Sequence, residues 1–104
     1  MVMIHICCNS VTDAHEIANF LLDEKLLSTA SINKNLSTMG PREGSKSGSD
    51  QTLLFGTTKA LLFHKIDILL KSKFPGAISS IYAIPIIYMG EQEAQKVKNE
   101  TQKV

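Results

Sequence analysis

Apolar positions change their spacing along the chain, and each spacing predicts an element. Residues 2–8 form a short apolar run that ends in polar residues, which is typical of a buried strand. From Ser10 to Glu24 the apolar residues instead recur at helical spacing, at Ala14, Ile17, Ala18, Leu21 and Leu22. Ser10 and Asp13 have the spacing of a helix-capping pair. The first quarter of the chain therefore predicts a strand followed by a helix.

The middle of the chain predicts two strands joined by a polar loop. Residues 28–36 alternate loosely between apolar and polar side chains, and residues 51–58 read as another strand. Between them, residues 37–50 are rich in Gly, Ser and Pro with mixed charge, which is typical of an exposed loop. The two strands can pair as a long hairpin.

The next apolar positions predict a second helix and a last strand. Helical spacing recurs at Leu62, Ile66, Leu69 and Leu70. Thr58 is in position to cap this helix, and we expect it to end near Lys73, because Pro75 disfavours helical backbone at the residue before it. Residues 79–87 then predict a strand with Pro85 near its end, on an edge or at a bulge.

The element order, strand-helix-strand given twice, favours one architecture. Each crossover is right-handed, so both helices share one face of the sheet. We predict an α+β fold, a ferredoxin-like βαββαβ sandwich with a four-stranded antiparallel sheet, over residues 1–90. Residues 91–104 follow as a charged tail or a short helix. The far face of the sheet should carry Ile32, Leu54 and Ile81 or their neighbours, which predicts self-association through that face or through strand edges.

Composition restricts the partners. A chain of 104 residues forms one domain that can bury a core without disulfides or metals. Eleven basic and ten acidic residues leave a net charge of +1, which argues against binding to nucleic acid or an anionic membrane. The apolar N-terminal run is too short for a signal peptide or a membrane span. We therefore expect a cytoplasmic protein with two reduced cysteines.

Four segments, taken in order, resemble one protein family. They read CNSVTDAHEIA at 8–18, LLDEKLLSTASIN at 21–33, LLFGTTKALLFHKI at 53–66 and SIYAIPI at 80–86. With these segments in this order and spacing, the chain resembles the CutA-type divalent-cation-tolerance proteins, which are small ferredoxin-like chains that form compact trimers. The resemblance implies a homotrimer with a role in tolerance of divalent cations, notably copper, and no enzymatic activity.

The chain departs from this family where the family carries polar side chains. The family's helix-to-strand turn usually reads His-Pro-Tyr-Glu-Val-Pro-Glu, whereas residues 74–80 read Phe-Pro-Gly-Ala-Ile-Ser-Ser. The family's second-strand cysteine falls on Ala30, and the chain has no Trp to match the family's Tyr-Arg-Trp hairpin. We therefore expect the scaffold to be kept and the usual polar cluster to be mostly lost, which argues against direct metal binding.

Cys8 is the candidate metal ligand that the resemblance leaves. It falls on the family's strand-end cysteine, and as a soft ligand it suits copper or zinc, shared between subunits. In the alternative interpretation, Cys7 and Cys8 point to opposite faces of a strand and are small buried apolar residues. The three histidines, His5, His15 and His64, show no ligand spacing. No residue pattern in the sequence calls for a cofactor. The resemblance implies that, if an ion is bound, it is copper or another divalent cation.

The polar loop offers a function of another class. Residues 38–50 lie between the second and third strands, where the related PII-type signalling trimers carry an effector-sensing loop. Arg42 and Lys46 could bind an anionic nucleotide or a partner protein there. The loop lacks phosphate-loop spacing, and no nucleophile-base motif is evident, so an enzyme is the least supported class. The alternatives are thus a PII-like sensing or interaction module and a structural trimer without its own ligand.

Overall fold

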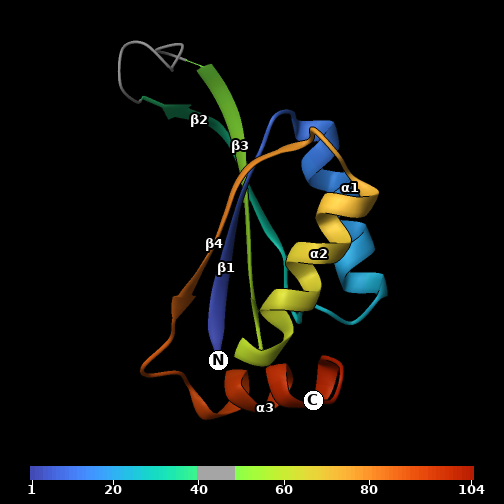
Figure 1. Cartoon of the computed structure of the whole chain (residues 1–104). Coiled ribbons are helices and arrows are strands. Elements are labelled where there is room, and N and C mark those ends of the chain that lie inside the picture. Colours follow the sequence, from blue (N-terminus) through green and yellow to red (C-terminus); the bar gives the residue numbers. More distant parts are fainter. Residues whose placement is uncertain (40–48) are drawn as a thin grey trace.

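The computed structural model describes residues 1–39 and 49–104, and over these residues four strands form one antiparallel sheet. In the order β2-β3-β1-β4, the strands are β2 (Ser31–Thr38), β3 (Ser49–Thr58), β1 (Val2–Cys8) and β4 (Ile78–Pro85). Two helices, α1 (Val11–Asp23) and α2 (Phe63–Lys73), lie on the same side of the sheet (Figure 1). The predicted ferredoxin-like βαββαβ arrangement is confirmed.

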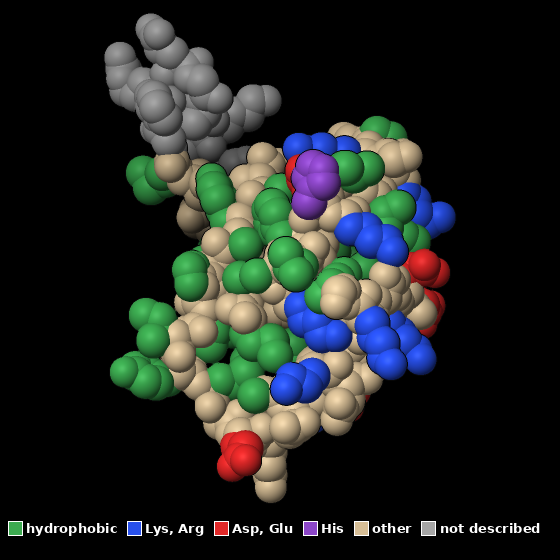
Figure 2. Space-filling view, turned by 60° about the horizontal axis from the view of Figure 1, so that its bottom comes forward, with side chains coloured by type: hydrophobic (Ala, Val, Ile, Leu, Met, Phe, Trp, Pro, Cys, Tyr) green, Lys and Arg blue, Asp and Glu red, His purple; other side chains and the backbone are tan. Residues whose placement is uncertain are grey.

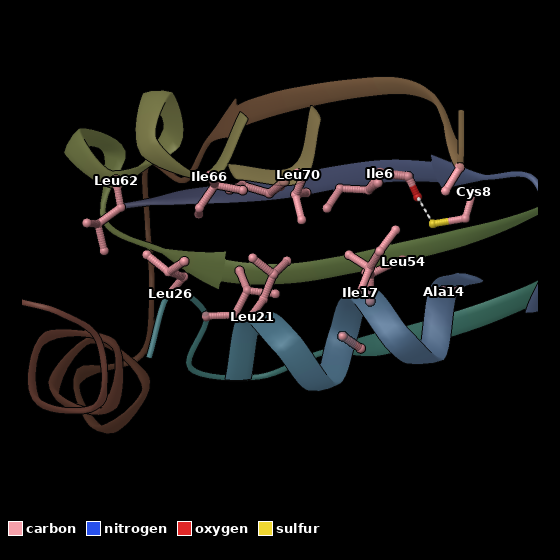
Figure 3. Close-up of a cluster of buried hydrophobic side chains, with 14 of the residues drawn as sticks. Ile6, Cys8, Ala14, Ile17, Leu21, Leu26, Leu54, Leu62, Ile66 and Leu70 are labelled. Carbon is pink, nitrogen blue, oxygen red and sulfur yellow. Dashed lines mark hydrogen bonds between the residues drawn. The ribbon is translucent and has the colours of Figure 1, made fainter. Parts of the chain in front are cut away.

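The core lies between the sheet and the two helices (Figure 3). Alternate side chains of β1 point into it, because successive residues of a strand face opposite sides. The most buried aliphatic side chains from β1, α1, β3 and α2 are Ile4, Ile6, Ile17, Leu21, Leu54, Ile66 and Leu70. Each contributes about 1.5–3 kcal/mol relative to an exposed position, so this cluster holds the helices on the sheet.

Helix α1 begins where the sequence predicts. The Ser10 hydroxyl accepts a hydrogen bond from the backbone N–H of Asp13 at 3.0 Å, and this satisfies one donor of the first helical turn. Leu22 is 38% exposed, since it lies at the margin of the apolar stripe. The helix ends at Asp23, and Lys25 follows with φ of 57°, a left-handed conformation that is common after helices.

The start of α2 differs from the prediction. Thr58 does not cap this helix, because it is the fully buried last residue of β3. The chain instead enters α2 through a short 3₁₀ helix, Ala60–Leu62, and Leu62 takes the N-cap position. The helix does end at Lys73, as Pro75 predicts.

Of the residues predicted for the far face of the sheet, the three named ones lie on the core side, and the alternative, their neighbours, holds. Leu54 is fully buried among the helices, and Ile32 and Ile81 pack against the same core. Their neighbours, including Phe55 and Tyr82, occupy the opposite face. A one-residue offset has this effect because side chains alternate along a strand.

The hairpin of β2 and β3 is confirmed; β2 begins three residues later than predicted, and both strands extend two residues further toward residues 40–48. The pairing shifts register between Asn33 and Leu36, where Asn35 has φ of 61°. β4 is an edge strand with Pro85 as its last residue, as predicted. An edge tolerates proline because no ladder donor is needed there.

The C-terminal segment forms a helix that is anchored to the rest of the chain. α3 (Glu91–Glu100) buries Val97, and it lies at the end of the sheet where β1 begins (Figure 1). Beyond it, the side-chain amide of Gln102 donates to the carbonyl oxygen of Glu24 at 2.7 Å. The Lys59 ammonium donates to the carbonyl oxygen of Gln102 at 2.8 Å. Of the described helices, none has the length and apolarity needed to cross a membrane.

Candidate functional site

The segment between α2 and β4 begins as a tight turn. The backbone N–H of Ala77 donates to the carbonyl oxygen of Phe74 at 3.2 Å, which closes a four-residue turn. Pro75 occupies the second position and Gly76, with φ of 79°, the third. These are the residues of a type II turn, in which the third position favours glycine. Pro75 and Gly76 thus have a geometric role in this turn.

Asn9 fixes this turn to the end of β1. Its backbone N–H donates to the carbonyl oxygen of Ala77 at 3.0 Å, and its side-chain amide donates to that of Gly76 at 2.7 Å. The Pro-Gly pair is a sequence signal that could have predicted the turn. The role of Asn9 could not be found in this way, because its partner lies 67 positions further along the chain.

A groove of about 510 Å³ runs between α2, this turn and β4. β4 pairs only with β1, so the backbone groups of its other edge have no partner strand among the described residues. The lining residues are Asp67, Leu70, Lys71, Phe74, Pro75, Gly76, Ile78, Ser79, Ser80, Ile81 and Tyr82. The groove therefore combines apolar contacts with an open strand edge.

The groove contains little reactive chemistry. The Lys71 ammonium lies 3.1 Å from Asp67 Oδ1, so the two charges of the lining offset each other. The Ser79 hydroxyl donates to the carbonyl oxygen of Cys7 at 3.2 Å. None of the residues that line this groove is a histidine or a cysteine. The arrangement suits docking of an extended backbone better than acid-base or nucleophilic catalysis.

The sheet face turned away from the helices, here called the outer sheet face, is largely apolar. The register places three cross-strand rows on it: Thr57, Met3 and Ile84; Phe55, His5 and Tyr82; Leu53, Cys7 and Ser80. Tyr82 and Ile84 are 62% and 45% exposed. Figure 2 shows apolar side chains gathered on the side of the molecule where β4 lies, with lysines gathered on the other. Such a patch is typical of an interaction surface.

Cys8 lies on the opposite face of β1 from Cys7, as the alternation predicts. It is fully buried, and its Sγ donates to the carbonyl oxygen of Ile6 at 3.7 Å (Figure 3). Burial, with Asp13 and Cys7 nearby, raises the pKa of the Cys8 thiol to about 12. Metals bind the thiolate form, so this environment argues against Cys8 as a ligand. That role stays a prediction.

The other candidate residues do not assemble into a centre. His15 and His64 are exposed on α1 and α2, whereas His5 lies on the outer sheet face. Within residues 1–39 and 49–104, no group of three or more His, Cys, Asp or Glu side chains is placed to hold a metal ion. Arg42 and Lys46 lie outside the described residues, so the sensing alternative stays a prediction.

Comparison with known proteins gives a likeness of fold over the full chain. No protein-family model matches the chain, and no curated protein matches it significantly. Among solved structures, CutA1 from Oryza sativa superposes with a TM-score of 0.89 at 17% identity, covering 99% of this chain and 94% of that one. The divalent cation tolerance protein from Thermus thermophilus gives a TM-score of 0.83 at 22% identity, covering 97% and 98%. The chain has the CutA1 fold.

A third relative of the CutA1 fold is the periplasmic divalent cation tolerance protein CutA from Archaeoglobus fulgidus, with a TM-score of 0.83 at 21% identity. The match covers 97% of this chain and 98% of that one, so the likeness includes the C-terminal helix α3. The CutA1 fold accounts for the helix order, the hairpin and the open edges.

Proposed function

We propose that the protein is a divalent-cation-tolerance protein of the CutA type that acts as a homotrimer and is not an enzyme. The observation that carries this proposal is the agreement of fold along the whole chain with proteins named for divalent cation tolerance. The groove chemistry supports the non-enzymatic part, since its lining offers no nucleophile beside a base. Copper is the cation that we propose to test first.

Two features of the sheet support self-association. The outer sheet face leaves Tyr82 and Ile84 exposed, and water covers them poorly. β2 and β4 are different edges of the same sheet, so pairing β2 of one copy with β4 of the next is a head-to-tail contact. Head-to-tail contacts form a closed ring when the rotation between copies closes, and a trimer is such a ring. The groove beside β4 then receives the neighbouring strand.

Light scattering on the purified chain tests the trimer. We expect three times the mass of one chain at micromolar concentration. Tyr82→Lys places a charge on the outer sheet face and should shift the mass to that of one chain while far-ultraviolet circular dichroism is retained. Ile68→Lys is the matched control, because Ile68 is 52% exposed on α2 and should leave the mass unchanged. A wild-type monomer would contradict the proposal.

Growth in copper tests the tolerance role. A copper-sensitive bacterial host that expresses the chain should grow at higher Cu²⁺ than the same host with an empty vector. The Tyr82→Lys variant, expressed to the same level, should protect less if the trimer is the active form. Equal growth of the wild-type and empty-vector strains would contradict the tolerance role.

A further inference from the structure

Strand β1 places three metal-binding side chain types on one side of the sheet. Met3, His5 and Cys7 occupy alternate positions and all lie on the outer sheet face, half-buried. Thioether, imidazole and thiolate are the donors that Cu(I) prefers, because it is a soft cation. No equivalent run occurs on the other described strands.

We propose that His5 and Cys7 together bind one Cu(I) ion. Residues two apart on a strand lie about 6.8 Å from each other along it. A nitrogen and a sulfur on opposite sides of one ion are about 4.4 Å apart at zinc-like bond lengths. The two side chains need only lean toward each other to meet this separation. Met3 lies two residues beyond His5, too far from Cys7 to share the ion with it.

The sheet holds both ligands in place. β1 is a central strand, hydrogen-bonded to β3 on one side and to β4 on the other. The His5 ring packs on Phe55 with 6.0 Å between ring centroids, which limits its rotation. The pairing of β1 with β4 shifts register between Cys7 and Cys8, and the hydroxyl of the extra residue, Ser79, donates to the Cys7 carbonyl oxygen. Such bulges are frequent beside functional sites.

Charge favours Cu(I) over a divalent ion at this position. On binding, the Cys7 thiol releases its proton to solvent, and one thiolate, one neutral imidazole and Cu(I) then sum to zero charge. A neutral complex loses little solvation energy on a half-buried apolar surface. The flanking residues of the three rows, Tyr82 among them, include no carboxylate that could offset a second positive charge. Zn²⁺ also takes four ligands as a rule, and the two side chains supply half of them.

A competition titration tests the site. The full chain is titrated with Cu(I) under anaerobic conditions against a chromophoric Cu(I) chelator, with ascorbate and no added thiol. We expect one Cu(I) per chain. Cys7→Ser and His5→Gln should each lower the affinity roughly 100-fold, since each removes one of two ligands. Met3→Leu and Cys8→Ala are the matched controls on the same strand and should keep wild-type affinity.

The outcomes distinguish a site at His5 and Cys7 from one at Met3 or Cys8. They also distinguish failure of the site from failure of the proposed function. Loss of affinity in Met3→Leu or Cys8→Ala, with Cys7→Ser unaffected, overturns the assignment, and so does one Cu(I) for every three chains. X-ray absorption should give one sulfur and one light-atom neighbour. Circular dichroism and light scattering confirm that each variant keeps its fold and mass. The biological meaning of the site rests on the proposed tolerance role: if His5→Gln loses Cu(I) but copper tolerance is unchanged, the site stands and its part in tolerance fails, whereas equal growth of the wild-type and empty-vector strains overturns the tolerance role and leaves the site in place.

Discussion

Gly56 lies where the chain leading into β2 crosses closely over β3. A methyl group built at Gly56 would overlap the carbonyl oxygen of Thr29 and would lie 3.0 Å from Leu27 Cδ1. The nearby bond from the N–H of Ser28 to the carbonyl oxygen of Thr57, at 3.0 Å, holds the two segments together. The absence of a side chain at Gly56 therefore permits the packing of this connection on the sheet.

Replacing Gly56 with alanine should destabilise the protein by about 1–3 kcal/mol, because the backbone of Thr29 must move to make room. Gly90→Ala is the control, since a methyl there meets only the flexible side chain of Glu93. At that N-cap position, alanine in place of glycine should cost about 0.5–1 kcal/mol, less than the backbone overlap at Gly56. Urea unfolding followed by circular dichroism measures both, and equal stabilities would contradict the close-approach argument.

The buried Cys8 thiol predicts a pH dependence of stability. Its pKa is raised from 9.0 to about 12 in the folded state, so the unfolded chain loses this proton at lower pH than the folded chain. The contribution of this group is fully present below pH 9 and is lost progressively as pH rises from about 9 to about 12. Cys8→Ala should be less stable at neutral pH, but its stability should fall less steeply across that window. Parallel curves for the two proteins would contradict a buried, protonated thiol.

At the scale of elements, the hydrophobic periods predict the strands and helices well, because one face of each element is buried. The buried stripe of α1 and the alternation in β1 follow directly from the sequence. Which residues of β3 and β4 face the core could not be predicted in this way, because apolar residues occupy both faces of these two strands. The predicted cap at Thr58 was wrong because threonine, which often caps helices, also occurs as a buried residue at the end of a strand. The anchoring of α3 depends on Lys59, Gln102 and Glu24, which are distant in sequence and carry no local signal.

The N-cap of α1 gives a prediction at this scale. Ser10→Ala removes the acceptor for the Asp13 N–H and should lower the free energy of unfolding by about 1 kcal/mol. Ser10→Asp keeps an acceptor at the same position and should retain wild-type stability. Thermal unfolding of the three proteins at one concentration measures the difference. A loss of the same size in both variants would assign the effect to packing instead of capping.

For the whole molecule, we predict that the outer sheet face and the two sheet edges couple folding to assembly. If three copies fold and associate together, each tenfold rise in concentration stabilises the folded chain by on the order of 1 kcal/mol. The melting temperature should then rise by about 5 °C per tenfold rise in concentration. Scanning calorimetry over a hundredfold range measures this, with Tyr82→Lys as the variant whose melting temperature should not depend on concentration. A constant melting temperature for the wild type would contradict coupled folding.

The strand order β2-β3-β1-β4 also sets a delay during synthesis. β1, an apolar strand, is made before either of its partners, since β3 begins at Ser49 and β4 at Ile78. At translation rates of about 5–20 residues per second, β1 waits roughly 2–10 s for β3 to be made. During that time its backbone groups and side chains are open to other nascent chains and to chaperones. The central position that pairs β1 on both sides in the folded protein thus leaves it without either partner for this interval on the ribosome.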